Sequence, residues 1–266
     1  MNQQMMLHQD KRNNKNIDYD WPLILAYHSV NQERKDSLAV STIDFDNQLA
    51  WLKKQGYRSL TLAEFLLQPV KKGEKVVIIT FDDGYADNYH LAFPILKRYG
   101  FVATIFLVSD YINTDQIFYW DVPKISNNYE QSLYKLLTWE QVQEMLDYGI
   151  EFGSHTCTHP ELSSLSREQC IEEITRSRQD LEAKLGREVV SFCYPRGKLN
   201  TEVIQLVEQA GYRGAVVTPK RSGIPLNPYT LRRVGIYQQT TPSVFRLKLT
   251  PLMRKNYERF KWLLGA

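Results

Sequence analysis

Residues 76–84 read VVIITFDDG, an apolar run that ends in two adjacent aspartates and a glycine. The run does not alternate between apolar and polar residues, which is typical of a strand buried on both faces in a parallel sheet. Similar runs recur along the chain with helical patterns between them. They lie at 23–28, 102–108, 150–154, 189–194 and 214–217. The sequence therefore predicts a parallel sheet wrapped by helices.

Start and stop signals frame the predicted helices. A hydroxyl side chain followed three residues later by Glu or Gln fits a capping box, and this spacing begins at Thr61, Thr138 and Ser166. Pro94 lies inside the predicted helix 87–99 and should kink it, because proline lacks a backbone donor. Four glycines follow helical stretches, where a helix commonly ends: Gly56, Gly100, Gly149 and Gly211.

A closed barrel is favoured over an open sheet. The 266 residues match the ~250 typical of a (β/α) barrel, and no glycine-rich dinucleotide turn follows the first apolar run. We expect a single barrel domain over 21–241, preceded by a flexible polar lead-in over 1–20. A basic amphipathic helical segment over 242–266 is expected to follow it.

The composition excludes several classes of protein. With 43% hydrophobic and 24% charged residues, the chain has the balance of a soluble globular protein. No stretch approaches the ~18 apolar residues of a membrane-spanning helix. The N-terminal residues lack the apolar core of a secretory signal, so we expect a cytoplasmic protein. Three scattered cysteines predict no disulfide framework.

The net charge of +3 comes from the C-terminal segment. Residues 242–266 contain six basic residues and one acidic residue, whereas the remainder contains 27 and 29. Because residues 1–241 have no excess of basic over acidic residues, the protein is not expected to bind nucleic acid. Docking of the segment onto the barrel is the favoured interpretation. The alternative is peripheral contact with an anionic membrane surface.

Side chains that could carry chemistry follow two of the predicted strands. Asp82 and Asp83 lie where a buried strand emerges, and adjacent carboxylates there need a cation or hydrogen bonds, although Asp-Gly is also a common turn. His155 and His159 follow another strand, four residues apart, so that both imidazoles can reach one ion. That spacing alone is often incidental. Cys157 between them is predicted to be a small buried residue rather than a ligand.

The two motifs together indicate a metal site. Functional groups of a (β/α) barrel lie at the carboxyl ends of its strands, and both motifs fall there. Two imidazoles and one carboxylate leave one position open, as in hydrolytic metal sites, and the second carboxylate is then near enough to act as a general base. Zinc is the expected ion, and cobalt, nickel and iron also suit imidazole ligands.

Residues 22–237 resemble the polysaccharide deacetylases with a NodB-type domain, carbohydrate esterase family 4. The resemblance rests on TFDDG at 80–84 and SHTCTHP at 154–160. It implies a distorted (β/α) barrel and metal-dependent removal of N-acetyl groups from saccharides. Carried over to this sequence, it implies that Asp82 is the catalytic base and that the metal ligands are Asp83, His155 and His159.

The third motif of the family is only partly present. Family members often have an Arg-x-Pro-Tyr sequence whose arginine braces the catalytic aspartate, but this chain reads FCYPRG at 192–197, with Cys193 in place of that arginine. The Tyr-Pro-x-Gly version is similar to the branch that includes the poly-N-acetylglucosamine deacetylases. That similarity implies that Tyr194 and Pro195 line the pocket and that the Arg196 N–H stabilises the oxyanion.

The late histidine of the family, its usual general acid, is also absent, since no histidine follows His159. In the same branch the motif order is permuted and a first-strand histidine takes that place, which implies that His28 is the general acid. The alternative for His28 is a core histidine bonded to a backbone carbonyl. Trp120 and Asp121, within the irregular stretch 113–137, could contact a sugar or belong to a packed loop.

The predicted substrate is an N-acetylated saccharide or glycoconjugate, cleaved to acetate and a free amine. One alternative is hydrolysis of another C–N bond, such as that of a cyclic imide or ureide, because the resemblance also covers such enzymes. The other is a non-catalytic carbohydrate- or metal-binding homologue, suggested by the absent arginine and late histidine. The grouping of two carboxylates with two histidines favours an enzyme, because such a cluster lowers stability and is rarely kept without a function.

Overall fold

The computed structural model describes residues 23–68, 70–71, 73–218 and 226–250. The predicted lead-in over 1–20, and the tail beyond Thr250, lie outside these residues. Within the described residues, nine parallel strands form one sheet in the order β10-β9-β8-β7-β6-β5-β1-β11, with β4 paired to β5. The strands are β1 (Leu23–Tyr27), β4 (Arg58–Leu60), β5 (Val76–Phe81), β6 (Thr104–Leu107), β7 (Glu151–Ser154), β8 (Ser191–Cys193), β9 (Gly214–Val217), β10 (Leu231–Arg232) and β11 (Val234–Gly235). A separate pair consists of β2 (Ser29–Val30) and β3 (Ala39–Val40).

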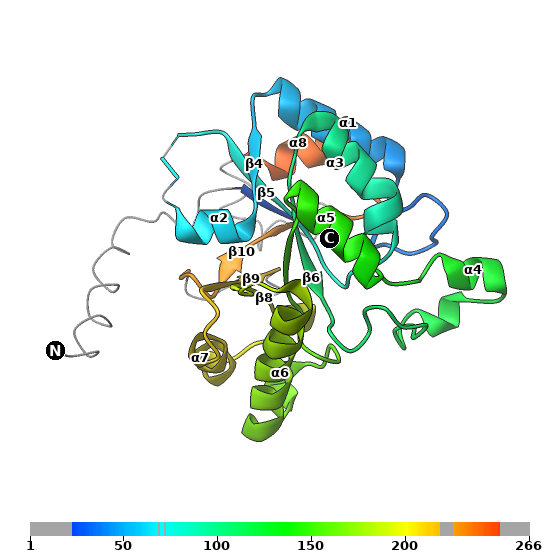
Figure 1. Cartoon of the computed structure of the whole chain (residues 1–266). Helices are drawn as coiled ribbons and strands as arrows, with labels where there is room; N and C mark the ends of the chain where they lie inside the picture. The colour runs from blue at the N-terminus through cyan, green and yellow to red at the C-terminus, as the bar shows by residue number, and fades with distance from the viewer. Residues whose placement is uncertain (1–22, 69, 72, 219–225, 251–266) are drawn as a thin grey trace.

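Helices connect the strands and cover the outside of the sheet. The α-helices are α1 (Thr42–Lys54), α2 (Leu62–Leu67), α3 (Phe93–Tyr99), α4 (Asn128–Ser132), α5 (Trp139–Tyr148), α6 (Arg167–Leu185), α7 (Thr201–Gln209) and α8 (Pro242–Lys248). The predicted capping boxes begin α2, α5 and α6, and all four predicted terminal glycines have a positive φ. Shorter turns are the π-helix η4 (Asn88–Ala92) and the 3₁₀ turns η5 (Val122–Lys124), η6 (Leu162–Ser164) and η7 (Pro195–Gly197). Figure 1 shows the arrangement.

The predicted helix 87–99 is divided rather than simply kinked. Asn88–Ala92 form the π-helix η4, in which the N–H of Phe93 bonds to the carbonyl of Asn88. Pro94 then lies in the first turn of α3, where a missing backbone N–H carries little cost. The wider π turn thus accommodates the proline, and the expectation of a kink inside one helix is corrected.

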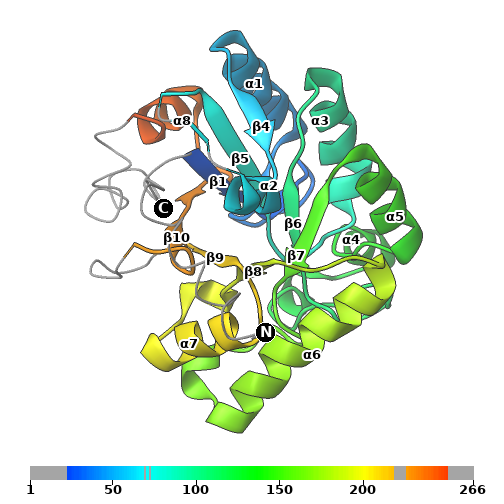
Figure 2. The ribbon, with the colours of Figure 1, turned by 60° about the vertical axis from the view of Figure 1, so that its left-hand side comes forward.

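The last two strands close the sheet into a nearly complete barrel. β10 pairs with β9 at one edge and β11 pairs with β1 at the other, and only Arg233 separates them. We call residues 231–235 the closing segment, since they are hydrogen-bonded to both edges. In Figure 2 the helices α1, α3, α5, α6 and α7 lie outside the strands. The predicted parallel barrel is confirmed.

The barrel interior is filled by side chains from one face of the strands. Gly153 on β7 leaves room for one of them, because a Cβ there would approach the Phe106 ring to 2.7 Å. Side chains two residues apart share a face of a strand, so the face that carries Ile24, Ile78 and Leu231 continues to His28, Asp82 and Arg233. The interior set is Ile24, Ile78, Phe106, Cys193, Val216 and Leu231, joined by Leu62 and Phe65 from α2.

The helix α8 begins the segment 242–266 and docks onto the barrel. Phe245 packs edge-on against Trp51 of α1, with ring centroids 6.0 Å apart. Lys248 is fully buried and donates to the carbonyl oxygen of Gly235 at 2.9 Å. One of the basic residues counted in this segment therefore faces the interior. Across the described residues, no helix has both the length and the apolar character needed to cross a membrane.

Candidate active site

Asp82 and Asp83 both reach the mouth of the barrel because the strand ends between them. Consecutive residues of an extended strand point to opposite faces, which would separate two adjacent carboxylates. Asp83 instead adopts a φ of 73°, in the left-handed region that non-glycine residues rarely occupy. Gly84 follows with a φ of 77°, where a Cβ would meet Leu107 at 2.8 Å. This turn directs both carboxylates toward the same site.

Arg233 of the closing segment holds Asp82 through two hydrogen bonds. Its Nη1 donates to Oδ1 at 2.6 Å and its Nη2 donates to Oδ2 at 2.7 Å. Nη1 also donates to the hydroxyl of Thr80 at 3.0 Å. Burial alone would raise the pKa of Asp82, but the guanidinium outweighs burial and holds that pKa well below its usual range. Asp82 is therefore ionised at neutral pH.

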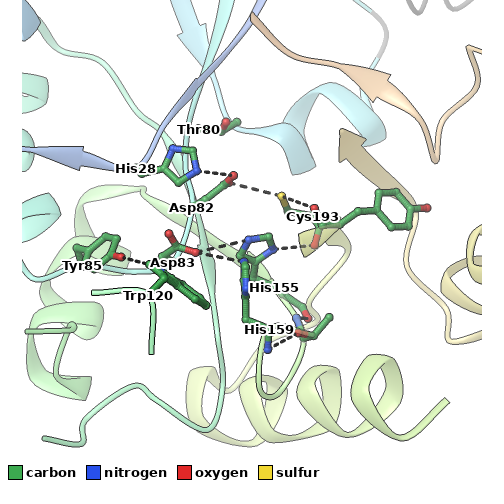
Figure 3. Close-up of polar contacts among 12 residues, drawn as sticks. His28, Thr80, Asp82, Asp83, Tyr85, Trp120, His155, His159 and Cys193 are labelled. Atoms are coloured by element: carbon green, nitrogen blue, oxygen red, sulfur yellow. Dashed lines mark hydrogen bonds and ion pairs between the residues drawn. The ribbon is translucent and has the colours of Figure 1, made fainter. Parts of the chain in front are cut away.

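Asp83, His155 and His159 converge on one point (Figure 3). The Nε2 atoms of His155 and His159 lie 3.7 Å and 3.6 Å from Oδ1 of Asp83. All three side chains are buried. The predicted grouping of these residues, which come from the ends of β5 and β7, is thus present in the fold.

The chemistry of these three side chains fits a metal ion. Oδ1 of Asp83 is buried and has no hydrogen-bond partner among the described residues. Burial lowers the pKa values of His155 and His159, which keeps both imidazoles neutral, the form that binds metals. Burial, and next the charge of Asp82, raises the pKa of Asp83, so a cation there would restore its ionised form.

Local hydrogen bonds fix the ring of His155 and the backbone of His159. Nδ1 of His155 lies 2.8 Å from the carbonyl oxygen of Cys193, which leaves Nε2 to face Asp83. Thr156 and His159 have φ values of 69° and 63°, and the N–H of His159 donates to the hydroxyl of Thr156 at 2.9 Å. We call residues 155–159 the ligand turn. Cys157 within it is buried and faces α6, where its Sγ lies 3.5 Å from the carbonyl oxygen of Glu173.

His28 lies beside Asp82, as Figure 3 shows, with its Nε2 3.7 Å from Oδ2 of Asp82. The side-chain amide of Asn88 donates to the carbonyl oxygen of His28 at 2.9 Å and so fixes the backbone there. Nδ1 of His28 has no partner among the described residues, which differs from a core histidine bonded to a carbonyl. Burial lowers the pKa of His28 to about 4.

Arg233 is the functional residue that sequence analysis missed. Cys193 does occupy the inner face of β8, where its Sγ accepts from Nη2 of Arg233 at 3.2 Å. The arginine that contacts Asp82 therefore comes from the closing segment instead. The sequence signal was a pair of arginines among apolar residues in LRRVGI at 231–236, a stretch too short for periodicity to indicate a strand.

The turn after β8 places the remaining third-motif residues at the rim. Arg196 has a φ of 55°, and its guanidinium contacts the Tyr119 hydroxyl and lies 5.6 Å from the ring centroid of Trp120. Pro195 is buried, and Tyr194 is only 1% exposed, with its hydroxyl donating to the carbonyl oxygen of Tyr229 at 3.0 Å. Contact of Tyr194 and Pro195 with substrate stays a prediction.

Trp120 and Asp121 have separate surroundings. The Trp120 ring lies 4.7 Å from that of His159 and stacks on Phe118, so it lies beside the candidate metal site. Asp121 is fully buried, and its carboxylate accepts from the hydroxyl of Tyr85 at 2.6 Å and from Lys124 at 2.7 Å. The sequence left two alternatives for this stretch, contact with a sugar or a packed loop. Asp121 fits the packed loop, whereas Trp120 lies at the candidate site.

A parallel barrel with two acids and two histidines at the carboxyl ends of its strands defines a metal-dependent hydrolase. The family model for polysaccharide deacetylase matches residues 70–215 of the chain. The chain belongs to this polysaccharide deacetylase family, whose general activity is metal-dependent de-N-acetylation of carbohydrates. The fold class and the enzyme class predicted from the sequence are confirmed.

Individual relatives agree with the family. YxkH of Bacillus subtilis (strain 168), which carries the name of a polysaccharide deacetylase, is 34% identical over 84% of this chain and 74% of that protein. The poly-beta-1,6-N-acetyl-D-glucosamine N-deacetylase of Staphylococcus aureus (strain MRSA252) is 27% identical over 80% of this chain and 72% of that protein. The solved structure of the Streptococcus pyogenes deacetylase PplD in complex with acetate has a TM-score of 0.69 and 26% identity, and covers 86% of this chain and 98% of that one.

Proposed function

We propose that this chain hydrolyses the N-acetyl group of an N-acetylated saccharide or glycoconjugate, with Asp82 as the general base. The observation that carries the proposal is the pairing of two neighbouring carboxylates with different partners. Arg233 holds Asp82 ionised, whereas Asp83 faces two neutral imidazoles. One carboxylate is thus available to accept a proton and the other to bind a cation.

Asp83, His155 and His159 would hold one divalent ion, for which zinc is the best match. One carboxylate and two imidazoles with an open position is a ligand set typical of catalytic zinc. When bound, such an ion would polarise the acetyl carbonyl and lower the pKa of a water molecule. Cobalt, nickel and iron suit the same ligands.

Asp82 would accept the proton of the attacking water. Its two oxygens are fixed in a plane by the two hydrogen bonds from Arg233, so that the carboxylate cannot rotate away from the ligand cluster. The guanidinium also favours the ionised form that a base requires. Arg233 acts through Asp82 and is therefore a positioning residue.

His28 would protonate the departing amine. Because burial lowers the pKa of His28 to about 4, the imidazole is neutral at neutral pH and must gain its proton during the reaction. Asp82 lies 3.7 Å away and would hold the proton taken from water, so it would pass that proton to His28. The leaving amine would take the proton from His28, which returns both side chains to their starting forms.

Backbone and rim groups would hold the rest of the substrate. The left-handed turn at Arg196 supports its N–H as the oxyanion donor. Trp120, beside His159, offers an aromatic face to a sugar ring. The homologue from Staphylococcus aureus, named for poly-beta-1,6-N-acetyl-D-glucosamine, supports a polymer of N-acetylglucosamine as the first substrate to try.

Acetate release from N-acetylglucosamine oligomers by the zinc-loaded protein tests the proposal. Asp82→Asn should lower kcat by about 10²- to 10⁴-fold, the usual contribution of a general base, while the zinc content is retained. His28→Ala should lower kcat with its zinc retained. His90→Ala is the matched control, since His90 contacts Gln141 on an exposed surface and should keep wild-type activity.

Other outcomes would count against these assignments. Unchanged acetate release by Asp82→Asn would exclude it as the base, and loss of zinc from His28→Ala would make His28 a ligand. Turnover of small cyclic imides without release of acetate from any sugar would select the alternative C–N bond.

Contact of residues 242–266 with an anionic membrane stays a prediction. Its described part supplies less basic surface than the sequence suggested, because Lys248 is buried. Cosedimentation with phosphatidylglycerol vesicles at low salt, lost on deletion of 251–266, would support the contact. Absence of cosedimentation at low salt would contradict it.

A further inference from the structure

The carboxylate of Glu173 on α6 accepts three hydrogen bonds from the ligand turn. Oε2 accepts from the backbone N–H groups of Cys157 and Thr158, each at 2.9 Å. Oε1 accepts from the hydroxyl of Thr158 at 2.6 Å. These groups lie between His155 and His159, so one side chain of α6 holds the segment that separates the two histidines. Figure 3 shows α6, in yellow-green, beneath this turn.

The opposite side of the turn is held from the loop after β6. The backbone N–H groups of Ser109 and Asp110 donate to the carbonyl oxygens of Thr156 and Cys157, each at 3.1 Å. Asp110 is in turn bound to Arg176 of α6 by two hydrogen bonds of 2.8 Å. The turn is therefore clamped between α6 and this loop, which the arginine links.

The conformation of the turn explains why it needs such a clamp. Thr156 and His159 both have a positive φ, which is unfavourable for a non-glycine residue and persists only where the surroundings enforce it. The N–H groups of residues 157 and 158 point outward from this turn. A carboxylate that accepts both satisfies them and also fixes the spacing of the two imidazoles.

We propose that Glu173 is a positioning residue of the metal site, which sets metal affinity by holding the ligand turn. This inference rests on the proposed ligand role of His155 and His159. Removal of the carboxylate would release the 157–158 peptide and let the imidazoles move apart. Groups behind the ligands of a metal site typically change affinity by 10- to 100-fold when removed.

Zinc titration of the metal-free full chain against a chromophoric chelator tests the proposal. Glu173→Ala should raise the Kd for zinc by about 10-fold or more. Glu173→Gln should recover most of the affinity, because the amide oxygen accepts from both N–H groups and the amide nitrogen can donate to Thr158. The visible absorption of the cobalt-loaded protein should weaken or shift in Glu173→Ala and return toward wild type in Glu173→Gln.

Glu168→Ala is the matched control. Glu168 lies on the same helix and has the same charge, but it is exposed in the first turn of α6, away from Arg176 and the ligand turn in sequence. Equal weakening in Glu168→Ala and Glu173→Ala would assign the effect to charge and overturn the proposal. Wild-type zinc affinity in Glu173→Ala would overturn it as well. Should Glu173→Ala not fold, Thr158→Val removes one of the three hydrogen bonds and should raise the Kd by a smaller factor, and an unchanged Kd there would overturn the proposal.

Failure of the wild-type chain to bind zinc or cobalt would instead remove the ligand assignment on which the inference depends. Normal metal binding by the wild type together with an unaffected Glu173→Ala would leave the ligand assignment standing. The two failures are therefore distinguishable in one titration series.

Discussion

Asp82 and Asp83 are neighbours in the chain but have opposite electrostatic surroundings. A guanidinium compensates the buried charge of Asp82, whereas burial and the nearby charge of Asp82 raise the pKa of Asp83. Such a division lets two identical side chains perform different tasks. The left-handed backbone at Asp83 makes it possible, because it turns the second carboxylate toward the two histidines.

Removal of the guanidinium of Arg233 should impair both catalysis and folding. In Arg233→Met the carboxylate of Asp82 stays buried without its partner, which typically costs about 3–5 kcal/mol of unfolding free energy. The kcat for acetate release should fall by about 100-fold, because the base is neither fixed nor held ionised. Urea unfolding and steady-state kinetics measure the two effects.

Two further variants separate these effects. Arg233→Lys keeps the charge but cannot donate two parallel N–H bonds, so its kcat should lie between those of Arg233→Met and wild type. The double variant Arg233→Met/Asp82→Asn should recover stability, since no buried charge remains, but not activity. A wild-type kcat in Arg233→Met would show that Asp82 needs no guanidinium.

Some residues of the candidate site could be predicted from the sequence and others could not, for physical reasons. Asp82, Asp83, His155 and His159 were predictable, because they lie in short motifs at the ends of long apolar strands. The partner of Asp82 was not, because Arg233 reaches it through barrel closure by two strands of two residues each. His28 could be related to Asp82 only through family resemblance, although strand alternation places it on the inner face.

At the scale of elements, local sequence signals predicted several strands and helix ends correctly. The predicted runs 76–81 and 214–217 coincide with β5 and β9, and all three capping boxes are formed. The very short strands β10 and β11 were missed, since two residues carry no periodicity. The π turn before α3 was also missed, because its cause is the fit of Pro94 into the packed structure rather than a local pattern.

The helix α8 should make stability depend on pH through Lys248. Burial lowers the pKa of Lys248 to about 8, from 10.5 in the unfolded chain. Between these values the unfolded chain binds more protons than the folded one, so stability rises with pH across this window. Below pH 8, the loss of unfolding free energy caused by burying Lys248 is complete. Urea unfolding from pH 7.5 to 10.5 should show wild type gaining about 1–3 kcal/mol relative to Lys248→Met.

An exposed lysine provides the comparison. Lys54→Met, at an exposed position near the end of α1, should show the same change in unfolding free energy across this window as the wild type. A constant difference between wild type and Lys248→Met over the whole window would contradict a lowered pKa for Lys248.

At the scale of the whole molecule, the proposed metal ligands connect distant parts of the barrel. Asp83 follows β5, whereas His155 and His159 follow β7, with β6 between these strands in the sheet. An ion bound by all three should therefore stabilise the folded barrel relative to the unfolded chain. Zinc at 100 times its Kd should add about 2.7 kcal/mol to the free energy of unfolding.

This linkage is measurable without a substrate. The thermal unfolding midpoint of the wild type should rise with zinc concentration, and removal of the ion by a chelator should reverse the rise. Asp83→Ala should show no such dependence, whereas Asp82→Asn should keep it although it has lost turnover. A zinc-dependent midpoint in Asp83→Ala equal to that of the wild type would place the ion elsewhere.

The closing segment has a consequence for how activity arises during synthesis. Residues 231–235 come late in the chain, and they are the last strand residues needed to join the two edges of the sheet. A nascent or truncated polypeptide that stops before them has the proposed metal ligands and the proposed base but lacks the guanidinium that holds Asp82. Under the proposed mechanism, full hydrolytic activity therefore requires that synthesis has passed Arg233 and that the barrel has closed.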